Sequence, residues 1–314
     1  MKKNWPFTNV VDDSIYESKI QWPKISIVTP SYNQCKYIEQ TILSIINQNY
    51  PNLEYIIIDG GSNDGSQEII KAYDKYLKHW ISEPDRGQVD AIQKGVIQCS
   101  GDIFNWINSD DLLAEKSLFN IAIAYMNNKN AKVITGGCTH FNNELNENET
   151  THVKDLTFKG LISEKSYFQQ PSQWILLSKI KNLDMDIKLH YSFDWGMILN
   201  FDLEKSDILY LTDNLSYFRE HEDAKTSKAS LLFQREKLVI VKKYLSETNS
   251  ISKKIMLSVY IFKLSSYLKI MDQLNKPSEI TFKNFLALGL RYPHLFFVRF
   301  YLGHLRKLAV EKKN

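Results

Sequence analysis

The run Asn105-Trp106-Ile107-Asn108-Ser109-Asp110-Asp111 is an apolar strand that ends abruptly in an amide and two carboxylates. An open α/β sheet binds its ligand at the carboxyl ends of its strands, so this position suits a binding site. Adjacent carboxylates repel each other unless a positive charge lies between them, and a divalent cation carried by substrate phosphates supplies that charge. The alternative is a solvated helix cap, because Ser109, Asp110 or Asp111 could each cap a helix through Leu118.

Strands and helices are predicted to alternate over the first 130 residues. β-Branched and apolar runs at residues 25–29, 54–59, 79–82 and 103–107 are typical of buried strands, and Pro30 is expected to stop the first of them. This alternation predicts a doubly wound sheet built from parallel βαβ units. Right-handed crossovers place the strand ends on one edge, where four polar residues are then expected to meet: Asn33, Asp59, Asp85 and Asp110.

The rest of the chain is less regular. We expect a capping box of Asp64 with Gln67, a strand over 132–138, an exposed loop over the Asn- and Glu-rich residues 141–152, and a strand from Ile208 to His221. Beyond Lys225 the pattern is helical. The predicted organisation is an arm over 1–24, a catalytic domain over 25–228 and a basic helical extension over 229–314.

Composition is ordinary for a globular protein, with 43% hydrophobic and 24% charged residues. The three cysteines, Cys35, Cys99 and Cys138, lie far apart without metal-ligand spacing, which favours reduced thiols in a cytosol over a disulfide framework. The N-terminus lacks the apolar core of a signal peptide, and no run of eighteen apolar residues predicts a spanning helix. The predicted location is therefore the cytoplasm.

Charge is distributed unevenly along the chain. From Ala229 onward the chain contains 16 Lys and Arg and 5 Asp and Glu, which gives this part a net charge of +11. The first 228 residues therefore carry a net charge of −8. The basic, aromatic-containing C-terminal region suits a helix on an anionic membrane, so it is a candidate for peripheral contact with the inner face of the plasma membrane. Alternatives are a helical cap on the sheet domain or a dimer surface. No nucleic-acid-binding module accompanies the charge, so no nucleic acid partner is expected.

Two common nucleotide-binding motifs are absent. The turn Gly60-Gly61-Ser62-Asn63-Asp64-Gly65 lacks the G-x-G-x-x-G spacing, and Asp59 precedes it where a diphosphate would be repelled. A Walker motif is also missing from the sequence. Nicotinamide enzymes and P-loop ATPases are therefore disfavoured.

Taken in order, the motifs resemble those of family 2 glycosyltransferases of the GT-A fold. The resemblance covers roughly residues 25 to 226 and implies a doubly wound mixed sheet, with a nucleotide-binding half plus an acceptor half and a C-terminal helical extension outside the match. The matching runs are Val28 to Asn33, Ile58 to Ser66, Glu83 to Gln88, Asn108 to Asp111, Gln170 to Ser172, Phe193-Asp194, Phe218-Arg219 with His221, and Lys225-Thr226.

The resemblance implies a set of residues that bind the nucleotide and the donor sugar. Tyr32 would offer a stacking face, and Asp59 would accept the imide hydrogen of uracil. The alternatives without a binding role are that Tyr32 is a surface aromatic residue and that Asp59 is a carboxylate of a strand-end turn. Arg86 would replace an arginine that the wider family carries in the following helix, unless it only forms a loop ion pair with Asp85. The full set is Pro30, Ser31, Tyr32, Asn33, Asp59, Asp85, Arg86, Asp90, Asn108, Ser109 and Lys225.

The same resemblance implies the metal ligands and the base. Asp110 matches the last acid of the D-x-D triplet and would bind Mn²⁺ or Mg²⁺, with His221 as a further ligand and with neutral Asn108 at the first position of the triplet. Asp111 is either a supporting acid or the helix cap considered above. Asp194 lies where the family places the base that takes the proton of the acceptor hydroxyl, while an acidic helix start is its alternative.

The predicted function is a metal-dependent, inverting transfer of a sugar from a nucleotide diphosphate donor, with a UDP-sugar expected, to a glycan or lipid-linked glycan acceptor in bacterial surface polysaccharide assembly. A nucleotidyltransferase is a rival, but it predicts a Gly-rich basic loop where Pro30 to Asn33 stand. The second rival is a catalytically inactive scaffold that keeps the nucleotide pocket and docks partners through its basic tail.

Overall fold

The structure is a computed structural model, and it describes residues 9–144, 146–163, 169–179, 183, 185–221, 230–274, 282–292 and 302. The chain divides into two compact units, Met1–Ser227 and Lys228–Asn314. The first unit holds every strand described below, and the second is helical.

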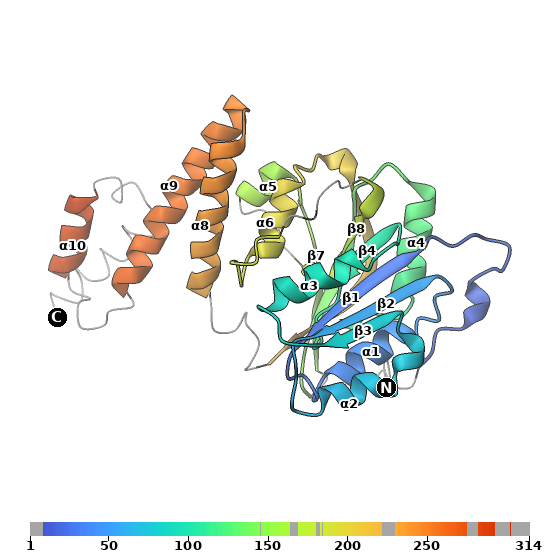
Figure 1. Ribbon diagram of the computed structural model, residues 1–314. Helices are drawn as coiled ribbons and strands as arrows, with labels where there is room; N and C mark the ends of the chain where they lie inside the picture. The colour runs from blue at the N-terminus through green and yellow to red at the C-terminus, as the bar shows by residue number, and fades with distance from the viewer. Residues whose placement is uncertain are drawn as a thin grey trace. The chain divides into compact units, whose positions relative to one another are not determined.

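A nine-stranded mixed sheet forms the first unit, in the order β3-β2-β1-β4-β8-β6-β9-β5, with β7 paired to β6 (Figure 1). The strands β3, β2, β1 and β4 are parallel, β8 is antiparallel to both β4 and β6, and β6 is parallel to β9. The carboxyl ends of β1 to β4, β6 and β9 therefore share one edge. The strands are β1 (Ile25–Ser31), β2 (Leu53–Asp59), β3 (His79–Ser82), β4 (Ile103–Trp106), β5 (Leu112–Leu113), β6 (Val133–Asn142), β7 (Glu147–His152), β8 (Gln173–Leu176) and β9 (Ile208–Glu220).

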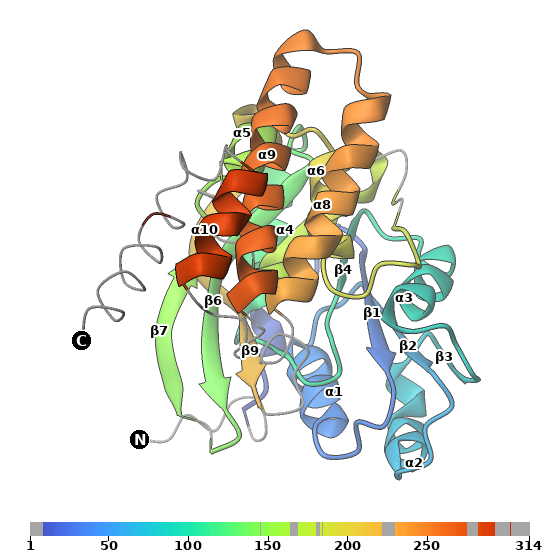
Figure 2. The ribbon, with the colours of Figure 1, turned by 90° about the vertical axis from the view of Figure 1, so that its left-hand side faces the viewer.

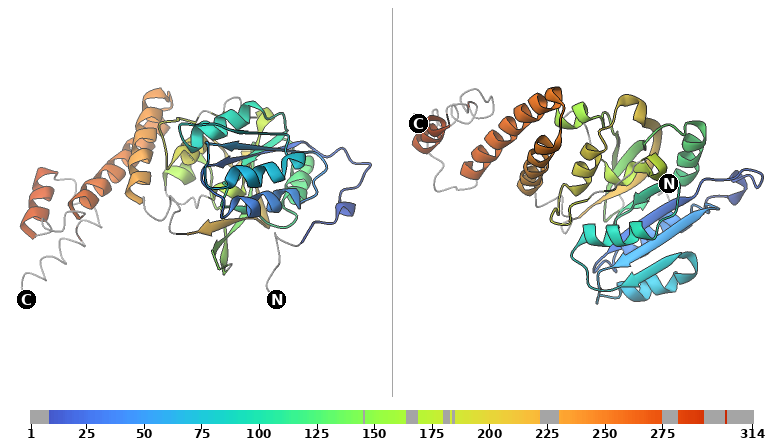
Figure 3. Two further views of the ribbon diagram at one scale, coloured as in Figure 1. Left: turned by 60° about the horizontal axis from the view of Figure 1, so that its bottom comes forward. Right: turned by 45° about the horizontal axis from the view of Figure 1, so that its top comes forward.

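Helices cover both faces of the parallel part of the sheet, with α3 on one face and α1 and α2 on the other (Figures 1 and 3). This confirms the predicted α/β fold with a doubly wound mixed sheet. The helices of this unit are α1 (Ile38–Ile46), α2 (Ser66–Ala72), α3 (Gln88–Ile97), α4 (Ser117–Asn127), α5 (Phe158–Ile162) and α6 (Phe193–Asn200), with a 3-10 turn η3 (Gln170–Ser172) before β8.

Isoleucine-rich strands supply the core because their branched side chains pack well on both faces of a buried sheet. The α3 face shows how close the packing is: a Cβ on Gly95 would lie 2.5 Å from a methyl of Val28, so only glycine lets α3 approach β1. On the other face, the segment before β1 contributes Val11, Tyr16 and Trp22 to the main core cluster.

Three local expectations were wrong. β1 continues through Pro30 to Ser31, because its pairing with β4 ends at Val28 and no partner there requires an N–H from Pro30. Residues 141–152 form no simple loop, since β6 extends to Asn142 and β7 pairs with it as a polar edge strand (Figure 2). The expected capping box is replaced by a turn in which Asp64 accepts hydrogen bonds from Ser66.

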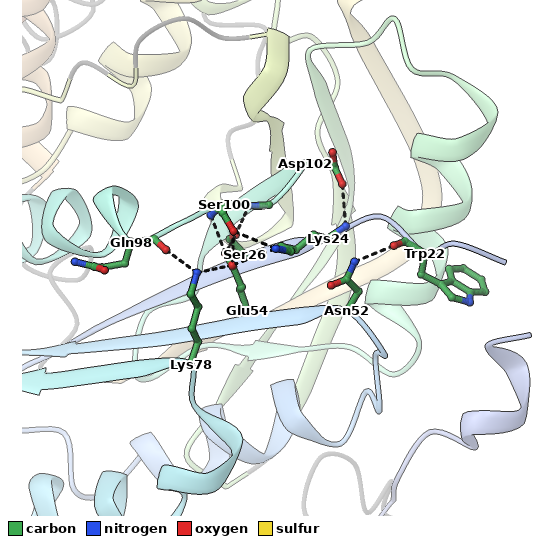
Figure 4. Close-up of polar contacts among 10 residues, drawn as sticks. Trp22, Lys24, Ser26, Asn52, Glu54, Lys78, Gln98, Ser100 and Asp102 are labelled. Carbon is green, nitrogen blue, oxygen red and sulfur yellow. Dashed lines mark hydrogen bonds and ion pairs between the residues drawn. The ribbon is translucent and has the colours of Figure 1, made fainter. Parts of the chain in front are cut away.

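A polar cluster joins the amino ends of β1, β2 and β4 (Figure 4). The carboxylate of Glu54 accepts hydrogen bonds from Ser26 Oγ at 2.6 Å, from the Ser100 N–H at 2.8 Å and from Lys78 Nζ. Burial opposes ionisation of this carboxyl, but these hydrogen bonds outweigh it and lower the pKa of Glu54 to about 2. The negative charge of Glu54 is therefore stabilised in the folded protein.

The second unit contains α8 (Ser230–Glu247), α9 (Ile251–Leu274) and α10 (Phe282–Arg291). The buried face of its helices is apolar, and Lys269 Nζ lies 3.7 Å from the ring centre of Tyr292, beyond the end of α10. No helix in the ranges described is long and apolar enough to span a membrane. The described part of residues 229–314 is helical, as the sequence predicts.

Candidate active site

The loops after β1 and β2 are held together by a buried carboxylate. Asp59 is fully buried and accepts hydrogen bonds from the N–H groups of Gly61 and Ser62 and from the hydroxyls of Ser62 and Ser82. The Ser62 hydroxyl also accepts a 2.7 Å hydrogen bond from the N–H of Asn33. Asp59 therefore shapes the turn that follows β2, which is the structural role considered for it above.

Gly60 forms the floor of a small cradle beside this turn. A Cβ at Gly60 would lie 2.8 Å from Asp85 Oδ2 and 3.2 Å from Tyr32 Cδ2, so the absence of a side chain lets both residues converge there. The ring of Tyr32 is 62% exposed and remains open to stacking. Asp85 is oriented by the N–H of Gly87, 2.8 Å from its Oδ1.

Arg86 pairs with Asp90 and not with Asp85, contrary to the loop ion pair considered above. Its Nη2 lies 2.8 Å from Asp90 Oδ1, and its N–H donates to Asp90 Oδ2 at 3.1 Å. Asp90 is buried in the first turn of α3, and the hydrogen bond from Arg86 lowers its pKa. Arg86 itself is largely exposed beside the cradle, where its guanidinium can meet an anionic ligand.

A chain of amides leads from α3 to the loop after β4. Gln88 Nε2 donates to Asn108 Oδ1 at 2.6 Å, and Asn108 Nδ2 donates to Asp111 Oδ2 at 3.0 Å. Ser109 is buried in the same loop. Asn108 thus uses both ends of its amide, which a carboxylate in its place could not do.

Asp111 is a buried supporting residue and not a helix cap, because β5 intervenes and α4 begins at Ser117. It is 1% exposed, and its Oδ1 accepts a 3.2 Å hydrogen bond from the N–H of Arg219. Burial, and then the adjacent charge of Asp110, raise the pKa of Asp111 well above its ordinary value. The carboxyl end of β4 therefore carries two acids in very different environments.

Arg219 is the buried cation under these acids. Its guanidinium carbon lies 4.8 Å from the ring centre of Tyr37 and 4.4 Å from that of Phe141, a double cation–π contact. Its Nε donates to the backbone carbonyl of Asp110 at 2.9 Å, and its Nη2 donates to Gln40. The side chain, which is 2% exposed, thereby fixes the backbone at Asp110.

Asp110 and His221 face each other across the ends of β4 and β9. His221 Nε2 lies 3.0 Å from Asp110 Oδ2, and its ring packs on Tyr37 at 4.9 Å between centres. The Nδ1 atom of His221 is buried and has no hydrogen-bond partner among the described residues. The carboxylate oxygen is a suitable ligand for Mn²⁺ and Mg²⁺, whereas the imidazole nitrogen suits a transition-metal ion better than Mg²⁺.

Two ligands alone do not enclose an ion. Within the described ranges, no group of three or more His, Cys, Asp or Glu side chains is arranged to hold a metal. An ion at Asp110 and His221 would therefore complete its coordination with substrate oxygens and water, as Mg²⁺ commonly does at nucleotide sites.

Asp194 lies in the first turn of α6, next to the end of β4. The ring of Phe193 packs on that of Trp106, the last residue of β4, at 5.9 Å between centres. Asp194 Oδ1 accepts a hydrogen bond from the Trp195 N–H at 2.7 Å, as an acidic helix start does. Gln170 of η3 ties the same strand end by donating to the Trp106 carbonyl at 2.9 Å.

The structure places the predicted residues on this common edge of the sheet, except that Lys225 lies outside the described residues. Sequence reasoning gave no role to Arg219, Tyr37 or Gln88, although Arg219 and Gln88 both stood in matching runs. The residues on the edge are Pro30, Ser31, Tyr32, Asn33, Asp59, Asp85, Arg86, Asp90, Asn108, Ser109, Asp110, Asp194 and His221.

Curated relatives of this chain are bacterial glycosyltransferases. It is 26% identical to glycosyltransferase GlyG of Streptococcus pneumoniae over 213 residues, which is 62% of this chain and 70% of GlyG. It is 40% identical to an uncharacterized glycosyltransferase of Haemophilus influenzae and 36% identical to the putative teichuronic acid biosynthesis glycosyltransferase TuaG of Bacillus subtilis. Those alignments cover 31% and 28% of this chain, and only 40% and 36% of the relatives' lengths.

Solved structures with the same fold include S. aureus TarS 1-349 in complex with UDP-GlcNAc, with a TM-score of 0.62 at 16% identity over 92% of this chain and 91% of that one. Another is the mannosyltransferase PcManGT of Pyrobaculum calidifontis in complex with GDP-Man and Mn²⁺, with a TM-score of 0.58 at 15% identity over 93% and 90% of the two chains. The family Glycosyl transferase family 2 matches residues 26–204, more than half of the sequence. The chain therefore belongs to glycosyltransferase family 2.

Proposed function

We propose that this glycosyltransferase performs a metal-dependent, inverting transfer from a UDP-sugar to a glycan or lipid-linked glycan in bacterial surface polysaccharide assembly. The observation that carries the proposal is the Asp110–His221 pair on the same strand edge as the cradle of Tyr32, Gly60 and Asp85. In this proposal the pair binds the cation and the cradle receives the nucleobase, both at one strand edge. The likeness of this chain to S. aureus TarS, which was solved in complex with UDP-GlcNAc, and to the putative teichuronic acid biosynthesis glycosyltransferase TuaG supports the donor and the pathway.

In this proposal the base of the donor stacks on the exposed ring of Tyr32, and Asp59 accepts its imide hydrogen at the buried turn after β2. Because Asp59 already accepts four hydrogen bonds, base binding exchanges one of them. Arg86, held by Asp90, approaches the diphosphate or the sugar. The exchange makes binding depend on the shape of the turn as well as on Asp59.

Asp110 and His221 would hold the Mn²⁺ or Mg²⁺ ion, with substrate oxygens supplying the remaining ligands. The ion supplies neutralisation of the departing diphosphate. Arg219 keeps the Asp110 backbone in position through its 2.9 Å hydrogen bond. Neutral Asn108 holds Asp111 and Gln88 in place at the first position of the triplet.

Asp194 is the proposed base that takes the proton of the acceptor hydroxyl. Its support is its place at the start of α6, which Phe193 anchors against the end of β4. An Asp194→Asn variant should keep UDP binding and lose turnover by at least about 10²-fold, the usual contribution of a general base. Unchanged turnover would remove Asp194 from this role.

The test of the proposed function is a donor screen. Purified protein is incubated with UDP-sugars and Mn²⁺, and UDP release and thermal stabilisation are both measured, because a ligand that binds only the folded state raises its stability. The absence of both UDP release and thermal stabilisation with every UDP-sugar tested would overturn the proposal. Stabilisation without release, in the presence of a broad set of acceptor glycans, would indicate the inactive scaffold.

We also propose that α9 contacts an anionic membrane. Four of its apolar side chains are spaced by four, four and three residues and are 45–76% exposed, so they share one helix face, with two exposed lysines beside them. These residues are Ile251, Ile255, Val259, Phe262, Lys254 and Lys263.

Sedimentation with phosphatidylcholine vesicles, with and without phosphatidylglycerol, tests this contact. The protein should sediment only with the anionic vesicles, and Ile255→Glu should abolish that. Ile97→Glu is a matched control, because Ile97 is an isoleucine that is 80% exposed at the end of α3. Equal sedimentation of the two variants would contradict the contact.

A further inference from the structure

A second polar cluster lies on the opposite face of β9 from Arg219 and His221. Side chains alternate along a strand, so Glu220 points away from the face that carries its two neighbours. His140 of β6, which is paired in register with Phe218, lies on the same side as Glu220. His140 Nδ1 and Glu220 Oε1 are 2.7 Å apart. No step of the donor chemistry above uses this pair.

The hydrogen bonds of the cluster determine the tautomer of His140. Gln169 Nε2 lies 3.0 Å from His140 Nε2, and an amide nitrogen can only donate. The Nε2 atom of His140 is therefore the acceptor, and its Nδ1 carries the hydrogen that it donates to Glu220. The pair is thus a carboxylate-oriented imidazole whose lone pair points toward Gln169.

The cluster has unused hydrogen-bonding capacity at the surface. The side chain of Glu220 is 49% exposed, whereas Gln169 is 5% exposed and rigidly placed by a further bond to Thr151. From the described residues, Glu220 Oε2 receives only the amide of Asn148, at 3.5 Å, which is a weak contact. A ligand that carries hydroxyl groups can replace this contact with a better one.

The composition of the cluster fits a sugar. Fixed polar groups beside an aromatic surface are what small-molecule sites use to orient a ligand, and the ring of Phe218 packs on His140 at 5.0 Å between centres. A carboxylate accepts from two neighbouring hydroxyls, while an amide can both donate and accept. The carboxylate of Glu220, the amide of Gln169 and the aromatic ring of Phe218 all belong to one connected cluster on this face.

The cluster is also joined to the candidate active site through the chain. Glu220 precedes His221, and Gln169 precedes Gln170, which donates to the carbonyl at the end of β4. A register irregularity between Thr139 and Phe141 lies beside His140, and such bulges commonly re-aim side chains next to active sites.

We propose that Glu220, His140 and Gln169 form a binding subsite for saccharide hydroxyl groups of the acceptor. This inference rests on the proposed function, because it assigns the subsite to the acceptor of that reaction. Glu220 accepts the hydroxyl hydrogens, His140 donates to Glu220 and is itself held by Gln169, and Phe218 lines the same face. The alternative is a pair that only fastens β6 to β9.

The test measures acceptor binding without turnover. Labelled full-length protein is applied to an array of bacterial and synthetic saccharides in the presence of UDP and Mn²⁺, and UDP binding is measured separately by thermal shift. Glu220→Gln preserves shape and removes the charge, and Glu147→Gln is the control, because Glu147 is an exposed acid on neighbouring β7. His140→Asn is a second variant that can still donate to Glu220.

We expect the parent and Glu147→Gln to bind the same saccharides, Glu220→Gln to bind them about tenfold or more weakly, and His140→Asn to fall between them. That loss is the usual result of removing hydrogen bonds to a charged group. Retained binding by Glu220→Gln overturns the subsite, and so does a loss of UDP binding in the same variant. Failure of the parent to bind any saccharide while UDP still stabilises it also overturns the subsite, yet leaves the donor proposal standing.

Discussion

The pKa of a buried carboxyl group is shifted in opposite directions at the two ends of the central strands. At the amino end, Glu54 is surrounded by donors and its pKa is lowered to about 2. At the carboxyl end, Asp110 and Asp111 are adjacent, and burial and the neighbouring charge raise the pKa of Asp111. The first arrangement stabilises the fold, whereas the second keeps two acids together at a cost in free energy that contacts elsewhere in the fold must offset. Such departures from local optimum are typical of functional sites.

The support at the carboxyl end comes from another part of the chain. Arg219 of β9 is placed under the acids between two aromatic rings, and its strand also brings His221 to Asp110. By contrast, the donors to Glu54 come from β1, the segment before β3 and the segment before β4. The amino-end cluster closes within the parallel half, while the carboxyl-end cluster requires both halves of the sheet.

The largest effect is expected for Asp110→Asn. If Asp110 binds the ion, its loss should lower kcat/KM with Mn²⁺ by about 10²–10³-fold, since a metal contributes several kcal/mol to transition-state charge stabilisation. Stability should fall little, because the change removes one of two adjacent acids. Steady-state UDP release and chemical denaturation measure both quantities, and near-parental activity would separate Asp110 from the ion.

The next effect is expected for Arg219→Met. Removing the buried guanidinium leaves the Asp110 carbonyl and Gln40 without their donor and the acids without a cation, so unfolding free energy should fall by about 3 kcal/mol. Urea denaturation gives the value. Arg219→Lys keeps the charge but not the planar fork, and it should recover only part of the loss. Full recovery by lysine would show that charge alone matters here.

At the amino end, Glu54→Gln should lower the unfolding free energy by about 2 kcal/mol at neutral pH, because four donor groups on Ser26, Lys78 and Ser100 lose a charged acceptor. UDP binding should not change, since the cluster lies at the far end of the strands. The folded-state pKa is depressed below its ordinary value of 4.5, so this stability is present above about pH 4.5 and is lost as pH falls toward 2.

Chemical denaturation at several pH values tests the expected pH dependence of the stability that Glu54 contributes. Denaturation of the parent and of Glu54→Gln across that range should give two curves that differ above pH 4.5 and converge below it. A difference that stays constant down to pH 2 would mean that shape, and not charge, stabilises the cluster.

The smallest effect is expected for Asp111→Asn, which replaces a carboxyl group with an isosteric amide, as Glu54→Gln does. Because burial disfavours the charged form of Asp111, an amide in its place should change the unfolding free energy by less than about 1 kcal/mol in metal-free buffer. A loss as large as that of Glu54→Gln would contradict the comparison of the two ends.

Much of the fold could be predicted because hydrophobic period and strand–helix alternation are local properties of the sequence. The four parallel strands, the strand at 208–220 and the C-terminal helices were found in this way. The hairpin of β6 and β7 was missed, because a polar edge strand has the composition of a loop and is stabilised by its pairing. Pro30 was misread as a stop because proline cannot donate to a ladder, but the pairing of β1 with β4 already ends at Val28, so no such donor is needed there.

The sequence by itself determined the family, the parallel half of the sheet and the residues at its edge, because each depends on motif order or on residues close in the chain. Only the tertiary structure decided what those residues contact. It paired Arg86 with Asp90, buried Asp111 against β9 and placed His221 opposite Asp110. Asp110 and His221 are more than a hundred residues apart, and it is the packing of β9 beside β5 and β6 that brings them together.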